Sequence, residues 1–145
     1  MSEMDPENPV VKLCAEGMRA EGENRFADAR ALFLQAWEAS RDDYDACVAA
    51  HFVARHQDTP EETLRWNREA LARADAAGGE RVRGFYPSLY LNLAHAHEQV
   101  GDLDEARRFY ARAAELADAL PDDRYGGVVR GGIAEGKKRI GAEEG

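Results

Sequence analysis

Three polar side chains near the middle of the chain, His51, Thr63 and Asn67, stand where related segments of the same sequence carry small or aromatic residues. A buried polar group without a hydrogen-bond partner costs about 1–3 kcal/mol, so these side chains need partners. They can bond to one another as a structural clasp between two helices, or they can line a polar pocket that recognises a ligand. The sequence leaves both interpretations open.

A second group of hydrogen-bond donors follows directly, in the string Ala54-Arg55-His56-Gln57. An arginine can hold a carboxylate or a phosphate through two parallel hydrogen bonds, which makes Arg55 a candidate for binding an acidic ligand. The alternative is a solvated arginine that is paired with a nearby acid of the same chain.

The histidine spacing does not favour a metal site. His51 and His56 are five residues apart, whereas residues three or four apart share one face of a helix. His95 and His97 point to different sides of the helix predicted around them. The chain also contains no Gly-x-Ser-x-Gly turn and no HExxH helix, two patterns that carry known chemistry. We therefore expect no catalytic residue, no metal and no cofactor.

Composition narrows the function classes further. The chain has 145 residues, with 44% apolar and 32% charged residues and a net charge of −9, which fits one globular domain covering residues 1–145 and disfavours a nucleic-acid partner. No apolar run reaches the roughly 20 residues that cross a bilayer, so we expect no membrane partner.

Cys14 and Cys47 are isolated, which is typical of reduced thiols in a cytoplasmic protein. Abundant alanine, and arginine in excess over lysine, suggest a GC-rich bacterial genome.

The elements that position these residues are marked by capping signals. Asn8-Pro9 and Thr59-Pro60 each place a capping side chain before a proline that can begin a helix, and Asp102 caps a further helix. Pro87 requires the helix around it to kink or to start nearby. We expect loose ends at residues 1–7 and 141–145 and helices near 9–22, 25–40, 42–56, 60–77, 81–99, 102–119 and 122–140.

A repeat relates these helices to one another. In SLYLNLAHAHEQVGDLDEARRFYARAAELAD, residues 88–118, small and aromatic residues occupy fixed positions: Ala94, Gly101, Ala106, Tyr110 and Ala113. The same spacing recurs earlier with Gly17, Asn24, Ala29, Phe33 and Ala36. A weaker copy between them carries His51, Thr63 and Asn67. The predicted core consists mainly of Leu32, Phe33, Trp37, Leu93, Phe109, Tyr110 and Leu116, and core is also the expected place for Trp66.

This pattern resembles the tetratricopeptide repeat (TPR) family, in which helix-turn-helix units stack into a solenoid. The resemblance implies an all-α fold, a right-handed α-solenoid of about three TPR-like repeats with a C-terminal capping helix. In that family the first helix of each repeat lines a concave groove. The matching groove residues here are Phe52, Arg55, His56, Ser88, Leu91, Asn92, His95 and Gln99.

The function implied by the resemblance is that of a non-enzymatic adaptor that binds a protein or peptide ligand in this groove. One alternative is a small-molecule or enzymatic site on the middle repeat, built from His51, Arg55, His56, Asn67 and His95. Another is a homo-oligomer formed through the solenoid ends, because such ends are natural contact surfaces.

Overall fold

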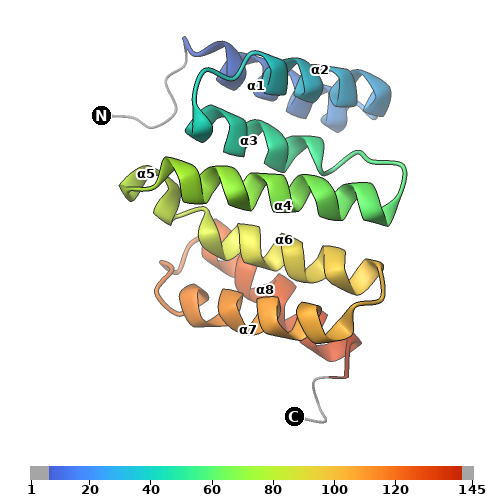
Figure 1. Cartoon of the computed structure of the whole chain (residues 1–145), viewed down its shortest axis with the longest axis vertical. Helices are drawn as coiled ribbons and strands as arrows, with labels where there is room; N and C mark the ends of the chain where they lie inside the picture. Colours follow the sequence, from blue (N-terminus) through green and yellow to red (C-terminus); the bar gives the residue numbers. More distant parts are fainter. Residues whose placement is uncertain (1–6, 142–145) are drawn as a thin grey trace. The chain divides into compact units, whose positions relative to one another are not determined.

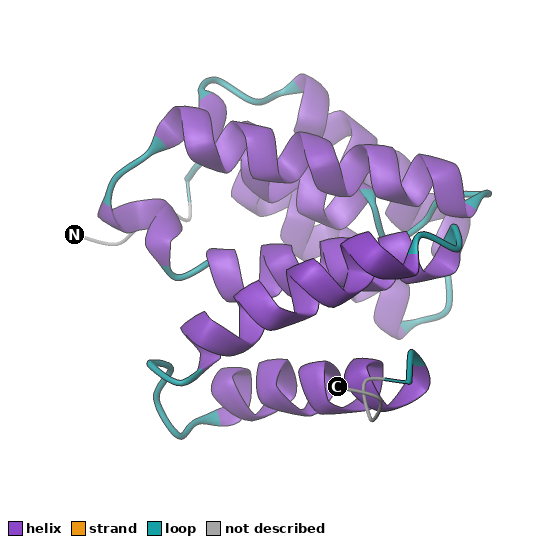
Figure 2. Cartoon of the chain, turned by 60° about the horizontal axis from the view of Figure 1, so that its bottom comes forward, coloured by secondary structure: helices purple, strands orange, loops and turns teal. Residues whose placement is uncertain are grey.

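The computed structural model describes residues 7–141, and every regular element in that range is an α-helix (Figures 1 and 2). The helices are α1 (Pro9–Gly22), α2 (Phe26–Glu38), α3 (Asp43–Val53), α4 (Pro60–Ala77), α5 (Glu80–Arg83), α6 (Tyr86–Gln99), α7 (Leu103–Ala117) and α8 (Arg124–Arg139). The prediction of an all-α protein is confirmed. Of the ends expected to be loose, 1–7 and 141–145, all but residues 7 and 141 lie outside the described residues.

The chain forms two compact units, Met1–Arg83 and Gly84–Gly145. In the first unit, α1 packs on α2 and α3 packs on α4, while α2 and α1 both contact α3. Phe33 of α2 is fully buried there. Its ring lies so close to Gly17 of α1 that a Cβ atom at Gly17 would clash with it. A small residue on one helix therefore accommodates a large ring from its partner.

The second unit consists of one helix hairpin and a third helix. In it, α6 and α7 form a hairpin, and α8 packs against both of them. Tyr110 of α7 is fully buried among Ala94, Ala106 and Ile140, and its ring would clash with a Cβ atom at Gly136 of α8. The glycines of the last helix therefore include one that is required for close packing.

Local capping signals place most helix starts where the sequence predicts them. The Asn8 Oδ1 atom accepts a hydrogen bond from the Val10 backbone N–H at 2.8 Å, and Thr59 Oγ1 accepts one from Glu62 at 3.1 Å. Pro87 lies in the first turn of α6, so the helix predicted at 81–99 is divided into α5 and α6. The last helix is capped by Asp123 and begins at Arg124, two residues after its predicted start.

Helix ends are predicted less well, and one difference matters for function. The helix predicted at 42–56 ends at Val53, so Arg55 and His56 follow α3 instead of belonging to it. Similarly, the helix predicted at 25–40 covers Phe26–Glu38.

Most of the predicted core is confirmed. Phe33, Leu93 and Tyr110 are fully buried, and Trp66 is buried as well. The centroid of the Trp66 ring lies 5.1 Å from that of Trp37 in an edge-to-face contact. Leu32, Trp37 and Phe109 are half-buried.

Leu116 was expected in the core, and this prediction is wrong. Its side chain is 40% exposed, whereas Tyr110, Ala113 and Ala117 of the same helix are buried. These three residues are three and four positions apart and so share one face of α7. Leu116 lies beside that face and points away from it.

A buried carboxylate that the sequence does not reveal joins α1 to α3. The Asp45 Oδ1 atom accepts a hydrogen bond from Asn8 Nδ2 at 2.8 Å, and its Oδ2 atom accepts bonds from the backbone N–H and the Nε atom of Arg41 at 3.1 and 3.3 Å. Both Asn8 and Asp45 are buried. The side chain that caps α1 is therefore itself held by α3.

We expect Asp45→Ala to lower the free energy of unfolding by about 1–3 kcal/mol, because the buried Asn8 amide would lose its acceptor. Urea denaturation followed by circular dichroism measures the change. Asp58→Ala is the matched control, since Asp58 is exposed and its contact with Arg30 is long, at 3.5 Å. A surface ion pair of this kind contributes about 0–1 kcal/mol. Equal effects of the two substitutions would contradict the structural role of Asp45.

Candidate functional site

The residues predicted to line a groove divide between the two units. The first unit contains Phe52, Arg55 and His56, and the second contains Ser88, Leu91, Asn92, His95 and Gln99.

In the first unit, Arg55 and His56 already bind a carboxylate of the same chain. Arg55 Nη2 lies 2.9 Å from Glu21 Oε1, and His56 Nε2 lies 2.6 Å from Glu21 Oε2. Glu21 comes from the last turn of α1, and its side chain is only 14% exposed. Arg55 is therefore paired with an acid of its own chain, which was the alternative to binding an acidic ligand. Both carboxylate oxygens of Glu21 are in contact with these two side chains.

Aromatic packing holds this ion pair in place. The Phe33 ring stacks on Phe52 at a centroid distance of 5.0 Å and on the imidazole of His56 at 5.9 Å. The Arg55 guanidinium lies over the Phe52 ring at 5.1 Å. The structure thus brings the three predicted residues together around Phe33, a core side chain of α2.

Two polar residues of the middle copy, Thr63 and Asn67, donate hydrogen bonds to backbone carbonyls four residues earlier. Asn67 is buried and donates a hydrogen bond to the Thr63 carbonyl at 3.0 Å. The Thr63 hydroxyl donates to the Thr59 carbonyl at 3.3 Å. Burial and, to a smaller extent, the charge of Arg55 lower the pKa of His51 to about 4, so its imidazole is neutral at physiological pH.

In the second unit, a cavity of about 220 Å³ includes three of the predicted residues, Leu91, Asn92 and His95 of α6. Its other walls are Tyr110 from α7 and Gly132, Glu135 and Arg139 from α8. A Cβ atom at Gly132 would lie 2.8 Å from Leu91 Cδ2, so the missing side chain lets α8 approach Leu91. The lining of the cavity combines the apolar side chain of Leu91 with charged or polar groups.

One wall of this cavity is a hydrogen-bonded network around Glu98. Arg139 donates to Glu98 through Nε at 2.8 Å and Nη2 at 3.2 Å, and the Tyr110 hydroxyl donates to Glu98 at 2.8 Å. The bonds from Arg139, and secondarily from Tyr110, hold the pKa of Glu98 below its usual range although burial opposes them. Burial and the bond to Glu98 raise the pKa of Tyr110 to about 12. These groups are therefore an ion pair and a neutral phenol at pH 7.

The two remaining predicted groove residues are not among those that line the cavity. The Ser88 hydroxyl oxygen lies 2.6 Å from that of Tyr125, which also donates to the Gly84 carbonyl at 2.8 Å. Gln99 is exposed and is the last residue of α6.

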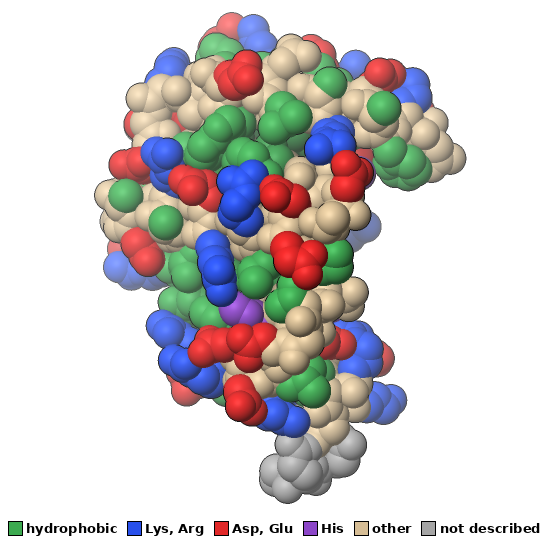
Figure 3. All heavy atoms as spheres, turned by 45° about the vertical axis from the view of Figure 1, so that its right-hand side comes forward, with side chains coloured by type: hydrophobic (Ala, Val, Ile, Leu, Met, Phe, Trp, Pro, Cys, Tyr) green, Lys and Arg blue, Asp and Glu red, His purple; other side chains and the backbone are tan. Residues whose placement is uncertain are grey.

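The described residues contain no group of three or more His, Cys, Asp or Glu side chains that could hold a metal ion. Burial raises the pKa of Cys14 and of Cys47 to about 12, so both are protonated thiols at neutral pH. None of the helices in the described range is long and apolar enough to cross a membrane. Figure 3 shows basic side chains interleaved with acidic ones on one face.

The sequence analysis missed the arginine partners of Glu21 and Glu98. Glu98 stands four residues after Ala94, as Glu21 does after Gly17. Each is bound by an arginine from a later segment, Arg55 for Glu21 and Arg139 for Glu98. The acidic residue at the same position of both repeats was the feature of the sequence from which these two sites could have been predicted.

The comparisons with models of known families, with characterised proteins and with solved structures gave no match.

Proposed function

We propose that this chain is a non-enzymatic module that binds a protein or peptide, built as a right-handed solenoid of about three TPR-like repeats with α8 as its capping helix. The supporting packing recurs at equivalent repeat positions. Gly17 meets the Phe33 ring in the first unit, and its counterpart Ala94 lies in the same core cluster as Tyr110 in the second. Gly136 of α8 meets the other end of this packing, against the Tyr110 ring.

The observation that carries the proposal is the cavity between α6 and α8. Leu91 contributes an apolar side chain to its lining, and His95, Glu135 and Arg139 contribute groups that can donate and accept hydrogen bonds. A peptide presents the matching combination, an apolar side chain flanked by polar backbone groups. The cavity would receive one anchoring side chain.

Size favours a peptide over an enclosed small molecule at this cavity. Its volume of about 220 Å³ lies below the roughly 300–1,000 Å³ of most small-molecule sites. The alternative site on the middle repeat has less support, because Arg55 and His56 are engaged by Glu21. A ligand carboxylate would have to displace Glu21 from two contacts before it could bind.

The test is selection of a random peptide library on the purified chain, followed by fluorescence polarisation of an enriched peptide. We expect His95→Ala and Leu91→Ala to weaken binding by about tenfold or more, since anchor contacts in an interface each contribute roughly 1–2 kcal/mol or above. His95 is exposed, so its truncation should leave the fold intact.

Arg108→Ala is the matched control. Arg108 is an exposed residue of α7 whose partner is Glu105 in the same helix, and it does not line the cavity. We expect this variant to bind like the unaltered chain. The proposed site would be refuted if the selected peptide bound both cavity variants as tightly as the unaltered chain, or if the selection enriched no peptide.

A further inference from the structure

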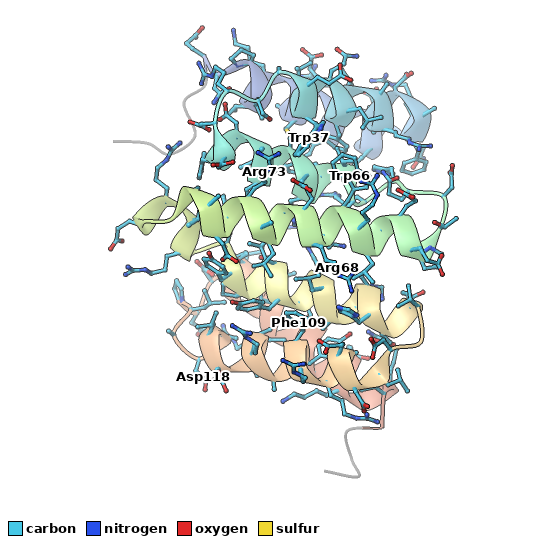
Figure 4. The ribbon with its side chains drawn as sticks, viewed as in Figure 1. Trp37, Trp66, Arg68, Arg73, Phe109 and Asp118 are labelled. Carbon is cyan, nitrogen blue, oxygen red and sulfur yellow. The ribbon has the colours of Figure 1, made fainter. Side chains whose placement is uncertain are left out.

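A second and larger cavity lies in the first unit, apart from every residue of the proposed groove. Its volume is about 420 Å³, within the roughly 300–1,000 Å³ typical of small-molecule sites. The walls come from the end of α2, the loop after it, the start of α3 and the C-terminal part of α4: Trp37, Ser40, Arg41, Asp42, Asp43, Ala46 and Arg73. Figure 4 labels Trp37 and Arg73 among the side chains of this unit.

Part of the charge in this cavity is already used within the chain. Arg73 donates through Nη1 to Asp43 Oδ1 at 2.9 Å and through Nε to Glu69 at 2.8 Å, and its guanidinium lies 5.2 Å from the centre of the Trp37 ring. The Asp42 Oδ1 atom caps α3 by accepting the Asp45 N–H at 2.8 Å. These contacts fix the Trp37 ring and one oxygen of each carboxylate.

The polar groups that remain carry both signs of charge. Asp42 and Asp43 each keep a second carboxylate oxygen that accepts no hydrogen bond from a described residue. Arg41 uses its backbone N–H and its Nε atom on Asp45, which leaves its two Nη groups for a ligand. A guanidinium and two carboxylates thus line the same cavity as one tryptophan.

We propose that this cavity binds a short zwitterionic peptide of about two residues. Asp42 and Asp43 accept hydrogen bonds from its ammonium group, Arg41 binds its carboxylate, and an apolar side chain lies on Trp37 and Ala46. A ligand with only positive charge would face Arg41 and Arg73, and one with only negative charge would face Asp42 and Asp43. The volume is nearly twice that of the cavity to which we assign one side chain, which accommodates a dipeptide.

The test follows the indole N–H signals of the isotopically labelled chain during titration with the dipeptide leucyl-leucine. The chain has two tryptophans, so Trp66→Phe assigns the Trp37 signal. We expect this signal to shift in a saturable way. The N-acetylated and C-amidated dipeptides each lose one charge-assisted hydrogen-bonding group, and we expect each to bind about tenfold or more weakly.

Two variants test the recognition of the ammonium group and of the carboxylate group one at a time, without removing a helix cap or a core side chain. Asp42→Asn keeps a good capping residue and should reduce the preference for the free ammonium group over the acetylated one, because only Asp43 then remains as a charged acceptor. Arg41→Gln should abolish the preference for the free carboxylate over the amide. Arg65→Gln is the matched control, because Arg65 is an exposed arginine placed over the other tryptophan ring.

The result that overturns this proposal is an absent or non-saturable Trp37 shift, or an equal response to all three compounds. Peptides selected at the α6–α8 cavity test a different set of residues, so the two proposals fail separately. We expect His95→Ala to leave the leucyl-leucine titration unchanged.

Discussion

Phe33→Ala is expected to lower the free energy of unfolding by about 3–5 kcal/mol, the range for deleting a fully buried aromatic side chain. The Phe33 ring is inaccessible to solvent, lies against Gly17 of α1 and stacks on Phe52. Removing the ring would leave a cavity where α1, α2 and α3 meet. Urea denaturation followed by far-ultraviolet circular dichroism measures the change.

Phe26→Ala provides the matched control, because Phe26 is the same residue type on the same helix but is 52% exposed. We expect its effect to stay within about 1 kcal/mol. The free energy of unfolding of a native domain is only about 5–15 kcal/mol. Phe33→Ala alone can therefore leave too little folded protein to show an unfolding transition. Phe33→Leu keeps most of the volume and keeps the loss measurable. Equal effects at positions 33 and 26 would show that Phe33 is not in the core.

The helix starts were predictable because their signals are local. Asn8, Thr59 and Asp102 each cap a backbone N–H two or three residues further on, so the sequence around the cap contains all the required information. The end of α3 at Val53 was not predictable in this way. The residues after it, Arg55 and His56, are held by Glu21 from another helix.

The candidate sites were predictable only in part, for the same reason. The repeat pattern pointed to Leu91, Asn92 and His95 as a group, and the structure places all three around one cavity. That pattern could not pair Glu98 with Arg139, because the pairing depends on how α8 packs against α6. The larger cavity around Trp37 was missed entirely, since Arg41 and Arg73 are far apart in sequence and carry no motif.

The glycines of α8 divide into two kinds that look alike in the sequence. A Cβ atom at Gly127 or Gly131 would meet nothing within 4 Å, whereas one at Gly136 would clash with the Tyr110 ring. All three are helical, so each has the low helix propensity of glycine. The packing of α7 against α8 therefore decides whether adding a methyl group stabilises or destabilises the fold.

Gly136→Ala is expected to destabilise the chain by about 1–3 kcal/mol, the usual result of overpacking a filled core. The Tyr110 ring cannot easily move aside, because its hydroxyl donates to Glu98 and accepts from Arg139. Gly131→Ala on the same helix should instead stabilise by up to about 1 kcal/mol, since alanine favours the helix and nothing opposes the methyl group. Thermal and urea denaturation of the two variants measure these opposite signs.

A double substitution identifies the cause of the Gly136 effect. Tyr110→Leu removes the ring that the new methyl group would strike, so Gly136→Ala should cost far less in that background. Coupling of about 0.5–3 kcal/mol is expected for residues in direct contact. The Gly131→Ala gain should be unchanged by Tyr110→Leu, because no side chain lies near that position. If Gly136→Ala stabilised the chain as Gly131→Ala does, α8 could not pack against the Tyr110 ring, and the cavity proposed to bind a peptide would lose the wall that Glu135 and Arg139 form.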